Sequence, residues 1–182
     1  MRTFQPEQAT FLLQNVLLPA VKNEYTLTKR VIEAIPPEAT AEKGDYRPDS
    51  CAKSALELAW HIATAEHRFH DAVASGEFNL TPSPRPENVR NSGDIAKWYA
   101  ESFEKDFERL TKLSGEQLSK MVDFRGLLQF PAVVFLHVGL NHTIHHRGQL
   151  STYLRPMGGK VPAIYGESYD SAEAKKAAQT AH

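Results

Sequence analysis

The chain has 182 residues, of which 41% are hydrophobic and 24% are charged, and its formal net charge is −1. This length and composition are typical of a single globular domain with a sizeable core. The charge provides no basic surface for nucleic acid or an anionic membrane, and no stretch approaches the roughly 20 apolar residues of a membrane span. The first residues lack the apolar core of a signal peptide, and a single cysteine, Cys51, excludes an internal disulfide. We therefore expect a cytoplasmic protein that binds neither nucleic acid nor membrane.

The first predicted helix spans residues 7–35, where apolar residues recur at helical spacing. Pro19 lies within this span and predicts a kink or a later start, because proline removes a backbone donor and crowds the preceding turn. Ile35 precedes two prolines and is expected to end the helix, since a residue before proline disfavours helical geometry.

A second helix is predicted over residues 50–76, with Asp49 or Ser50 as its cap. The segment 79–93 is predicted to be irregular, because prolines at every second position from 82 to 86 exclude a helix there and favour an extended chain. It is long for a tight antiparallel turn, which indicates a crossover. A third helix with a strongly aromatic inner face is predicted over residues 94–113.

The remainder of the chain is predicted to contain one more long helix. Residues 116–130 form a connection in which the apolar piece 121–124 is expected to be extended. The fourth helix is predicted over residues 131–155, and its first residue is a proline, which suits a first helical turn. Residues 171–182 have no apolar face and are expected to fray. The sequence therefore predicts an all-α fold, a four-helix bundle in a single domain over residues 1–170, with a long crossover-type connection between its second and third helices.

Three histidines fall within five residues of the predicted fourth helix. An α-helix advances about 100° per residue, so His142 and His146 lie about 40° apart on one face and can share one metal ion. His145 lies about 60° to the other side of His142 and could compete for that role. Gln149 and Tyr153 continue the stripe and could hydrogen-bond to the metal-binding histidines. The alternative interpretation is a solvated helix face that carries histidines by chance.

On the second helix, His61 lies at the margin of the apolar face. A lone histidine there is more often a hydrogen-bonded core residue, but opposite a His-x3-His helix in a bundle a ligand role is favoured. Glu57, one turn earlier, could orient His61, although such a glutamate is more often a surface carboxylate. His67 and His70 lie far round this helix from His61 and are expected to face solvent or a subunit contact.

Two further residues of the fourth helix stand out. Arg147 lies about 140° from His142 and is expected to point outward, toward a salt bridge or a subunit contact. Gly148 costs a helix interior about 1 kcal/mol relative to alanine, which indicates a close helix crossing at this position.

Several short motifs of the two histidine-bearing helices occur together: Trp60-His61-Ile62 with Glu66, Asn141-His142, His146-Arg147-Gly148-Gln149, and Tyr153-Leu154-Arg155 with Val161-Pro162 and Tyr165-Gly166. In this combination the chain resembles the DinB/YfiT-like family over residues 7–169. The resemblance implies a four-helix bundle, commonly dimeric, in which His61, His142 and His146 bind a divalent metal ion. It also implies a metal-dependent thiol S-transferase that acts with a low-molecular-weight thiol, or a related hydrolase.

The predicted metal site leaves two hypotheses of different classes. Three neutral imidazoles leave open coordination positions on Zn²⁺, Ni²⁺, Mn²⁺ or Fe²⁺, as in catalytic sites, and this supports an enzyme that acts on a small-molecule substrate. The other hypothesis is a non-catalytic metal-binding bundle with a sensing or stress role. A fourth protein ligand would favour the second hypothesis, whereas a pocket open to solvent beside the metal would favour the first. In either case, the resemblance implies a homodimer.

Overall fold

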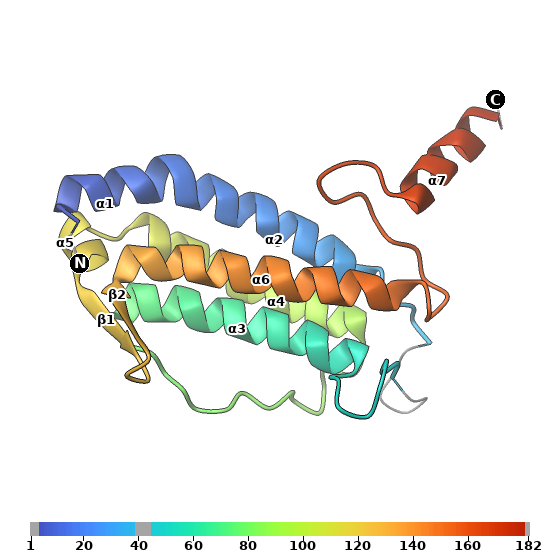
Figure 1. Cartoon of the computed structure of the whole chain (residues 1–182), viewed down its shortest axis with the longest axis horizontal. Coiled ribbons are helices and arrows are strands. Elements are labelled where there is room, and N and C mark those ends of the chain that lie inside the picture. The colour runs from blue at the N-terminus through green and yellow to red at the C-terminus, as the bar shows by residue number, and fades with distance from the viewer. Residues whose placement is uncertain (1–3, 39–44, 181–182) are drawn as a thin grey trace.

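A computed structural model of the protein describes residues 4–38 and 45–180, and its long helices run side by side along the molecule (Figure 1). The helices that run along the molecule are α2 (Leu18–Glu33), α3 (Ala55–Ser75), α4 (Ser92–Thr111) and α6 (Ala132–Leu154). Both α2 and α3 pack against α4 and against α6, and the most extensive of these contacts joins α3 to α6. Aliphatic and aromatic side chains from these elements fill the core between them. The expectation of a mainly helical chain is therefore confirmed.

The first helical span is continuous through Pro19 because a wider turn precedes the proline. The helix α1 (Pro6–Leu12) leads into the π-helical turn η1 (Leu13–Leu17), and α2 follows. The N–H of Leu18 donates to the carbonyl of Leu13, five residues earlier. A proline in a regular α-helix collides with the carbonyl four residues before it, and a π turn at that point relaxes the crowding.

The segment between α3 and α4, residues 76–91, returns along the surface of α3 (Figure 1). The Trp60 indole N–H donates to the carbonyl of Ser83 at 2.9 Å, and the Arg68 guanidinium donates to the carbonyl of Thr81 at 3.0 Å. Ser83 thus lies against Trp60, which precedes Arg68 on α3, whereas Thr81 lies against Arg68. The segment therefore runs opposite to that helix.

The start of α4 is fixed beside the end of α2. The Ser92 hydroxyl donates to the carbonyl of Ile35 at 3.1 Å, and the Asn91 side chain caps the helix by accepting from the N–H of Asp94 at 3.0 Å. Because α3 also begins at this end of the molecule, α3 and α4 run in the same direction (Figure 1).

A small β-hairpin departs from the expectation of an all-α fold. The short helix α5 (Gly115–Ser119) is followed by the antiparallel strands β1 (Met121–Phe124) and β2 (Leu128–Pro131). The turn between the strands places both Arg125 and Gly126 at positive φ, 59° and 70°, and such a turn matches the twist of a hairpin. The extended piece at 121–124 was expected, but its partner strand was not, since Arg-Gly is a weaker turn signal than Asn-Gly.

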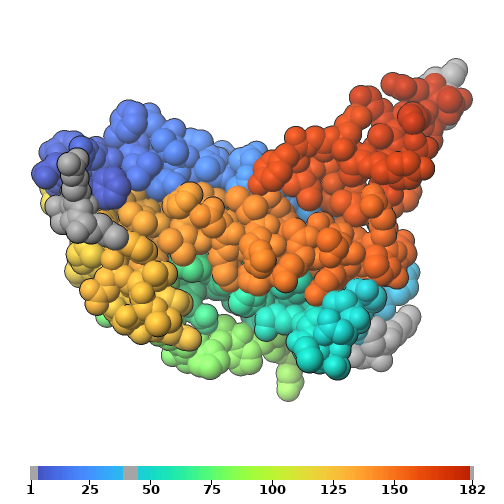
Figure 2. All heavy atoms as spheres, viewed as in Figure 1, coloured from blue at the N-terminus to red at the C-terminus, as the bar shows by residue number. Residues whose placement is uncertain are grey.

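Residues 169–180 form a helix where residues 171–182 were expected to fray, and residues 181–182 lie outside the described part of the chain. The helix α7 (Tyr169–Thr180) buries no side chain, and it projects away from the other helices (Figure 2). Its first turn is held by an ion pair of 3.0 Å between Arg155 and Asp170. None of the helices that the structure describes is long and apolar enough to cross a membrane.

The close crossing of α3 and α6 lies at Gly139 and not at Gly148, where the sequence indicated it. A Cβ atom added to Gly139 would lie 2.9 Å from Cβ and Cγ of Phe69 on α3, whereas one added to Gly148 would meet nothing within 4 Å. Gly139 therefore lets the two histidine-bearing helices approach each other.

We expect Gly139→Ala to lower the free energy of unfolding by about 1–2 kcal/mol, because the added methyl group forces α3 and α6 apart by more than its helix propensity recovers. Gly148→Ala, the matched change on the same helix, should raise the free energy of unfolding by up to about 1 kcal/mol. Urea unfolding followed by circular dichroism measures both effects. Equal stabilisation by the two substitutions would contradict a close crossing at Gly139.

Candidate metal centre

The position of His61 is set by the way α3 begins. Ser54 caps the helix: its hydroxyl accepts from the N–H of Glu57 at 3.3 Å, and the Glu57 carboxylate accepts from the N–H of Ser54 at 2.9 Å. Ser54 therefore takes the capping role that was predicted for Asp49 or Ser50. The Glu57 carboxylate also accepts from Arg47 at 2.8 Å, so its partners are the cap and the arginine. The reciprocal cap fixes where α3 starts, and His61 follows on its second turn.

The structure brings together the histidines that the sequence singles out from the two helices. One possible ligand atom from each of His61, His142 and His146 lies within 4.8 Å of the others. The ring centroid of His61 is 5.0 Å from that of His142 and 4.7 Å from that of His146, and the latter two centroids are 4.4 Å apart. All three side chains are half-buried. One helical turn separates the two histidines of α6, and the packing of α3 on α6 supplies the third.

The environment of the cluster favours neutral imidazoles. Burial, followed by the charges of His146, Lys53 and Arg68, lowers the pKa of His61 to about 4. Burial and the neighbouring histidines likewise lower the pKa of His142 to about 4. Burial also lowers the pKa of His146, against the opposing effect of its hydrogen bond to Gln149. At neutral pH the three rings therefore keep nitrogen lone pairs that can bind a cation.

One buried atom of the cluster lacks a hydrogen-bonding partner within the described residues. This atom is Nδ1 of His142. Buried polar atoms are normally paired, and a divalent metal ion is a partner that an imidazole nitrogen can take. The donor set therefore fits a metal ion.

Of the four residues that the sequence placed around the metal ligands, Gln149 makes the direct contact. Its amide oxygen accepts from Nδ1 of His146 at 2.6 Å, which leaves Nε2 of that ring free to face the cluster. The exposed ring of His145 lies 4.9 Å from that of His146, centroid to centroid, outside the group of converging nitrogens. Tyr153 packs edge-on against Tyr46, with 5.5 Å between ring centroids.

Glu66 has a structural role that the sequence did not reveal. Its carboxylate is buried and accepts from the Tyr99 hydroxyl at 2.8 Å and from the Thr143 hydroxyl at 2.9 Å. Burial raises the pKa of Glu66 to about 7, although both hydrogen bonds act in the opposite direction. Because Thr143 follows His142 directly, this contact ties α3 to α6 beside the cluster. A glutamate among the small apolar residues of an inner helix face was the signal available in the sequence.

Arg147 is buried and does not point outward as the sequence indicated. Its guanidinium forms an ion pair of 2.5 Å with Glu24 of α2 and donates to the Tyr165 hydroxyl at 2.6 Å, and that hydroxyl donates to the same carboxylate at 2.7 Å. The side of α6 opposite the histidines is covered by α2. A side chain about 140° from His142 therefore points into the protein and not to solvent. Arg147 thus anchors α6 at the residue after His146.

His70 also differs from expectation, because α4 covers its side of α3, whereas the His67 side chain remains partly exposed. The His67 ring donates from Nδ1 to the buried Asp106 carboxylate at 2.6 Å, and this bond raises the pKa of His67 despite partial burial. His70 is buried, which lowers its pKa to about 4 although Asp106 lies 3.9 Å away. Neither histidine joins the cluster at His61.

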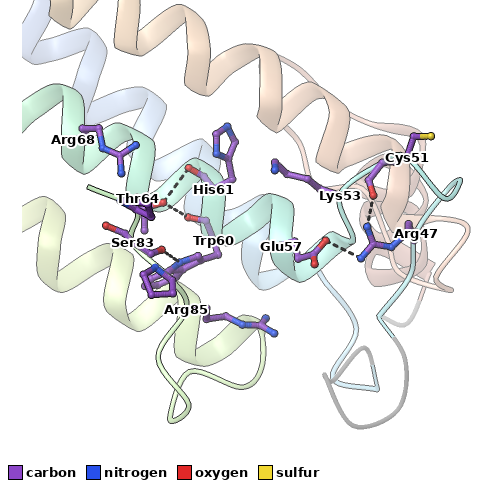
Figure 3. A pocket seen from close by; sticks show the side chains of 13 residues that line it. Arg47, Cys51, Lys53, Glu57, Trp60, His61, Thr64, Arg68, Ser83 and Arg85 are labelled. Carbon is purple, nitrogen blue, oxygen red and sulfur yellow. Dashed lines mark hydrogen bonds and ion pairs between the residues drawn. The ribbon is translucent and has the colours of Figure 1, made fainter. Parts of the chain in front are cut away.

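A pocket with a volume of about 750 Å³ opens beside the cluster (Figure 3). His61 and Thr64 of α3 line one side of it, and the returning segment at 82–85 lines another. The pocket therefore reaches the cluster at His61 and provides space for a small molecule next to that residue.

The fold and the site together define a helical protein with a three-histidine cluster that can hold a metal ion. The model of the DinB family matches residues 9–179, and the chain belongs to this family. A relative from Bacillus subtilis strain 168, the uncharacterised protein YjoA, is 27% identical over 140 residues, which cover 76% of this chain and 89% of YjoA.

Two solved structures are similar to about four-fifths of the chain. The crystal structure of YjoA, a DinB-like protein, matches with a TM-score of 0.64 and 25% identity, over 80% of this chain and 94% of that one. A DinB-like protein from Bacillus cereus ATCC 10987 matches with a TM-score of 0.66 and 25% identity, over 82% and 95%. The resemblance to this family that the sequence motifs indicated is confirmed.

The buried carboxyl of Glu66 generates a prediction about stability and pH. Its pKa is about 7 in the folded protein against an ordinary value of 4.5, so folding favours the neutral form. The stability that the neutral carboxyl contributes is fully present below pH 4.5 and is lost as the pH rises through 7. We therefore expect Glu66→Gln, which mimics the neutral carboxyl, to stabilise the metal-free protein by up to about 3 kcal/mol at pH 8 and to have little effect at pH 5.

Urea unfolding of the wild type and Glu66→Gln at the two pH values measures this difference. Glu101→Gln on the exposed face of α4 is the matched control and should change stability little at either pH. A loss of stability on Glu66→Gln at pH 8 would show instead that the fold favours the charged carboxylate.

Proposed function

We propose that His61, His142 and His146 hold a divalent metal ion and that the protein uses it in thiol S-transfer, with a low-molecular-weight thiol as one substrate. The observation that carries this proposal is the convergence of three neutral imidazoles, from two helices, beside an open pocket. Membership of the DinB family agrees with it. Zn²⁺, Ni²⁺, Mn²⁺ and Fe²⁺ all accept imidazole ligands, so the donor set does not select among them.

The number of converging ligands supports a catalytic metal ion over a structural one. Within the described residues, the cluster contains three histidines and gains no fourth histidine, cysteine or carboxylate. Structural zinc sites take four protein ligands, whereas catalytic sites keep a position for substrate or water. A divalent ion held there lowers the pKa of a bound thiol or water and so supplies a nucleophile at neutral pH.

The surrounding carboxylates favour a thiol over water as the nucleophile. Glu57 is bound to Arg47 and to the helix cap, and Glu66 is buried between Tyr99 and Thr143. Neither is free to act as a general base for water. A thiol requires less assistance than water, because its pKa is far below that of water. In the transfer, the sulfur forms a bond to the electrophile, the leaving group departs with its bonding electrons, and the thiol proton passes to solvent.

We also infer that α2, α3, α4 and α6 form a four-helix bundle whose crossover connection is the segment 76–91. Support comes from the pairwise packing of these helices and from the hydrogen bonds that align the segment opposite to α3. In this arrangement the connection passes the metal cluster and becomes a wall of the substrate pocket.

Metal content tests the proposed centre. After purification and loading with Zn²⁺, we expect the wild type to hold close to one ion per chain. His61→Ala and His142→Ala should each weaken binding by about 100-fold or more, because each removes one of the three ligands, the first from α3 and the second from α6. His145→Ala, which removes an exposed histidine next to the cluster, is the matched control and should bind like the wild type. Inductively coupled plasma analysis and competition with a chromophoric chelator provide the measurements.

The outcome for His61→Ala decides whether the site bridges the two helices. Full metal retention in this variant would mean that α6 binds ions alone, and the proposed catalytic centre would fail. With binding established, loss of free thiol in the presence of an alkyl halide tests the transfer reaction. The rate of this loss above the uncatalysed background should require the metal and be absent in His142→Ala.

A further inference from the structure

The pocket beside His61 has a basic lining, although the chain as a whole carries a net charge of −1. Among the described residues its one acidic lining residue is Glu57, which forms an ion pair of 2.8 Å with Arg47. The other cations of the lining, Lys53, Arg68 and Arg85, form no ion pair within the part of the chain that the structure describes. A concave surface with charge of one sign concentrates its electrostatic field, so this pocket attracts anions.

Arg68 is held by the segment that runs along α3, and Arg85 is part of that segment. The Arg68 guanidinium donates to the carbonyl of Thr81, and the Trp60 indole fixes the segment through Ser83, two residues before Arg85 (Figure 3). These contacts leave most guanidinium N–H groups of Arg68 available for a ligand.

Arg85 provides an independent observation. Its Nη1 atom is buried and has no hydrogen-bond acceptor among the described residues. A buried guanidinium N–H without an acceptor is costly, so a rotation of the Arg85 side chain that brings Nη1 to an anionic oxygen in the pocket would be favourable. Planar guanidinium groups also match the geometry of carboxylate and phosphate oxygens.

The basic lining reaches the metal cluster. The Lys53 side chain extends toward His61 (Figure 3), and Lys53, His61 and Arg68 line the same pocket. An anion bound by these groups would therefore lie next to His61.

We propose that this pocket binds a carboxylate or phosphate group of the substrate that reacts at the histidine cluster, with Lys53, Arg68 and Arg85 as the binding residues. The role of the anion as part of a reacting substrate rests on the proposed function, whereas anion binding itself does not. The substrate is thus a small molecule with an anionic group on one side and its reacting atom on the other. The anion positions the reacting atom against the three histidines.

Binding of two probe anions to the metal-free protein tests the site. Inorganic phosphate represents phosphate esters, and succinate represents dicarboxylates. Isothermal titration calorimetry and amide chemical shifts should show saturable binding of one or both, with shifts centred on residues 53, 68 and 85. Lys53→Met and Arg85→Met should each weaken binding by about fivefold or more, because each removes a charge-assisted hydrogen bond.

Two matched variants control for net charge. Arg90→Met removes an exposed arginine from the same segment, and Lys97→Met removes an exposed lysine from α4. Neither lines the pocket, and both should bind the probe within twofold of the wild type. Lys53 is exposed, so Lys53→Met tests the proposal even if Arg85→Met fails to fold.

The results separate the anion site from the metal centre. Absence of saturable binding by both probes, or equal weakening by Lys53→Met and Lys97→Met, would overturn the proposal. Zn²⁺ content measured in the same variants should be unchanged, because none of the substituted residues belongs to the histidine cluster. Anion binding without metal binding would overturn the proposed function and leave the anion site intact.

Discussion

The packing of α3 against α6 is the constraint on which the histidine cluster depends. His61 comes from one helix and His142 and His146 come from the other, so a small separation or rotation of the helices would disperse the three nitrogens. Gly139 allows the close approach, because Phe69 of α3 occupies the space where a side chain would stand. Apolar packing at this crossing therefore determines the distances between the imidazole nitrogen of His61 on α3 and those of His142 and His146 on α6.

Polar contacts on both sides of α6 fix its rotation about its own axis. Thr143, next to His142, donates to the buried Glu66 of α3, and Arg147, next to His146, pairs with the buried Glu24 of α2. Buried ionisable groups cost desolvation free energy and often add little net stability, but they discriminate strongly against other registers. An α6 rotated by one residue would leave both carboxylates without these partners, so the two contacts favour the rotation in which the histidines meet His61.

The sequence was sufficient for features that depend on one helix and insufficient for those that depend on its neighbours. Helical spacing predicted the long helices, and the His-x3-His pattern placed His142 and His146 on one face. The same arithmetic placed Arg147 and His70 on other faces correctly but could not say that α2 and α4 cover those faces, so both were wrongly expected outside. Gly139 was missed for the same reason, because an unusually close neighbour leaves no trace in the sequence of one helix.

The pocket shows why the connection between α3 and α4 matters for function. If these helices were joined by a short turn they would run in opposite directions, and the surface of α3 beside His61 would be open. The returning segment instead lies along α3, where the hydrogen bonds from Trp60 and Arg68 hold it, and it brings Arg85 to the same side as Lys53. The helices thus supply the three imidazoles, and a segment without regular structure encloses the space and provides charge next to them. The proposed metal site and the proposed anion site share α3, which carries both His61 and Arg68, whereas Arg85 comes from the connecting segment.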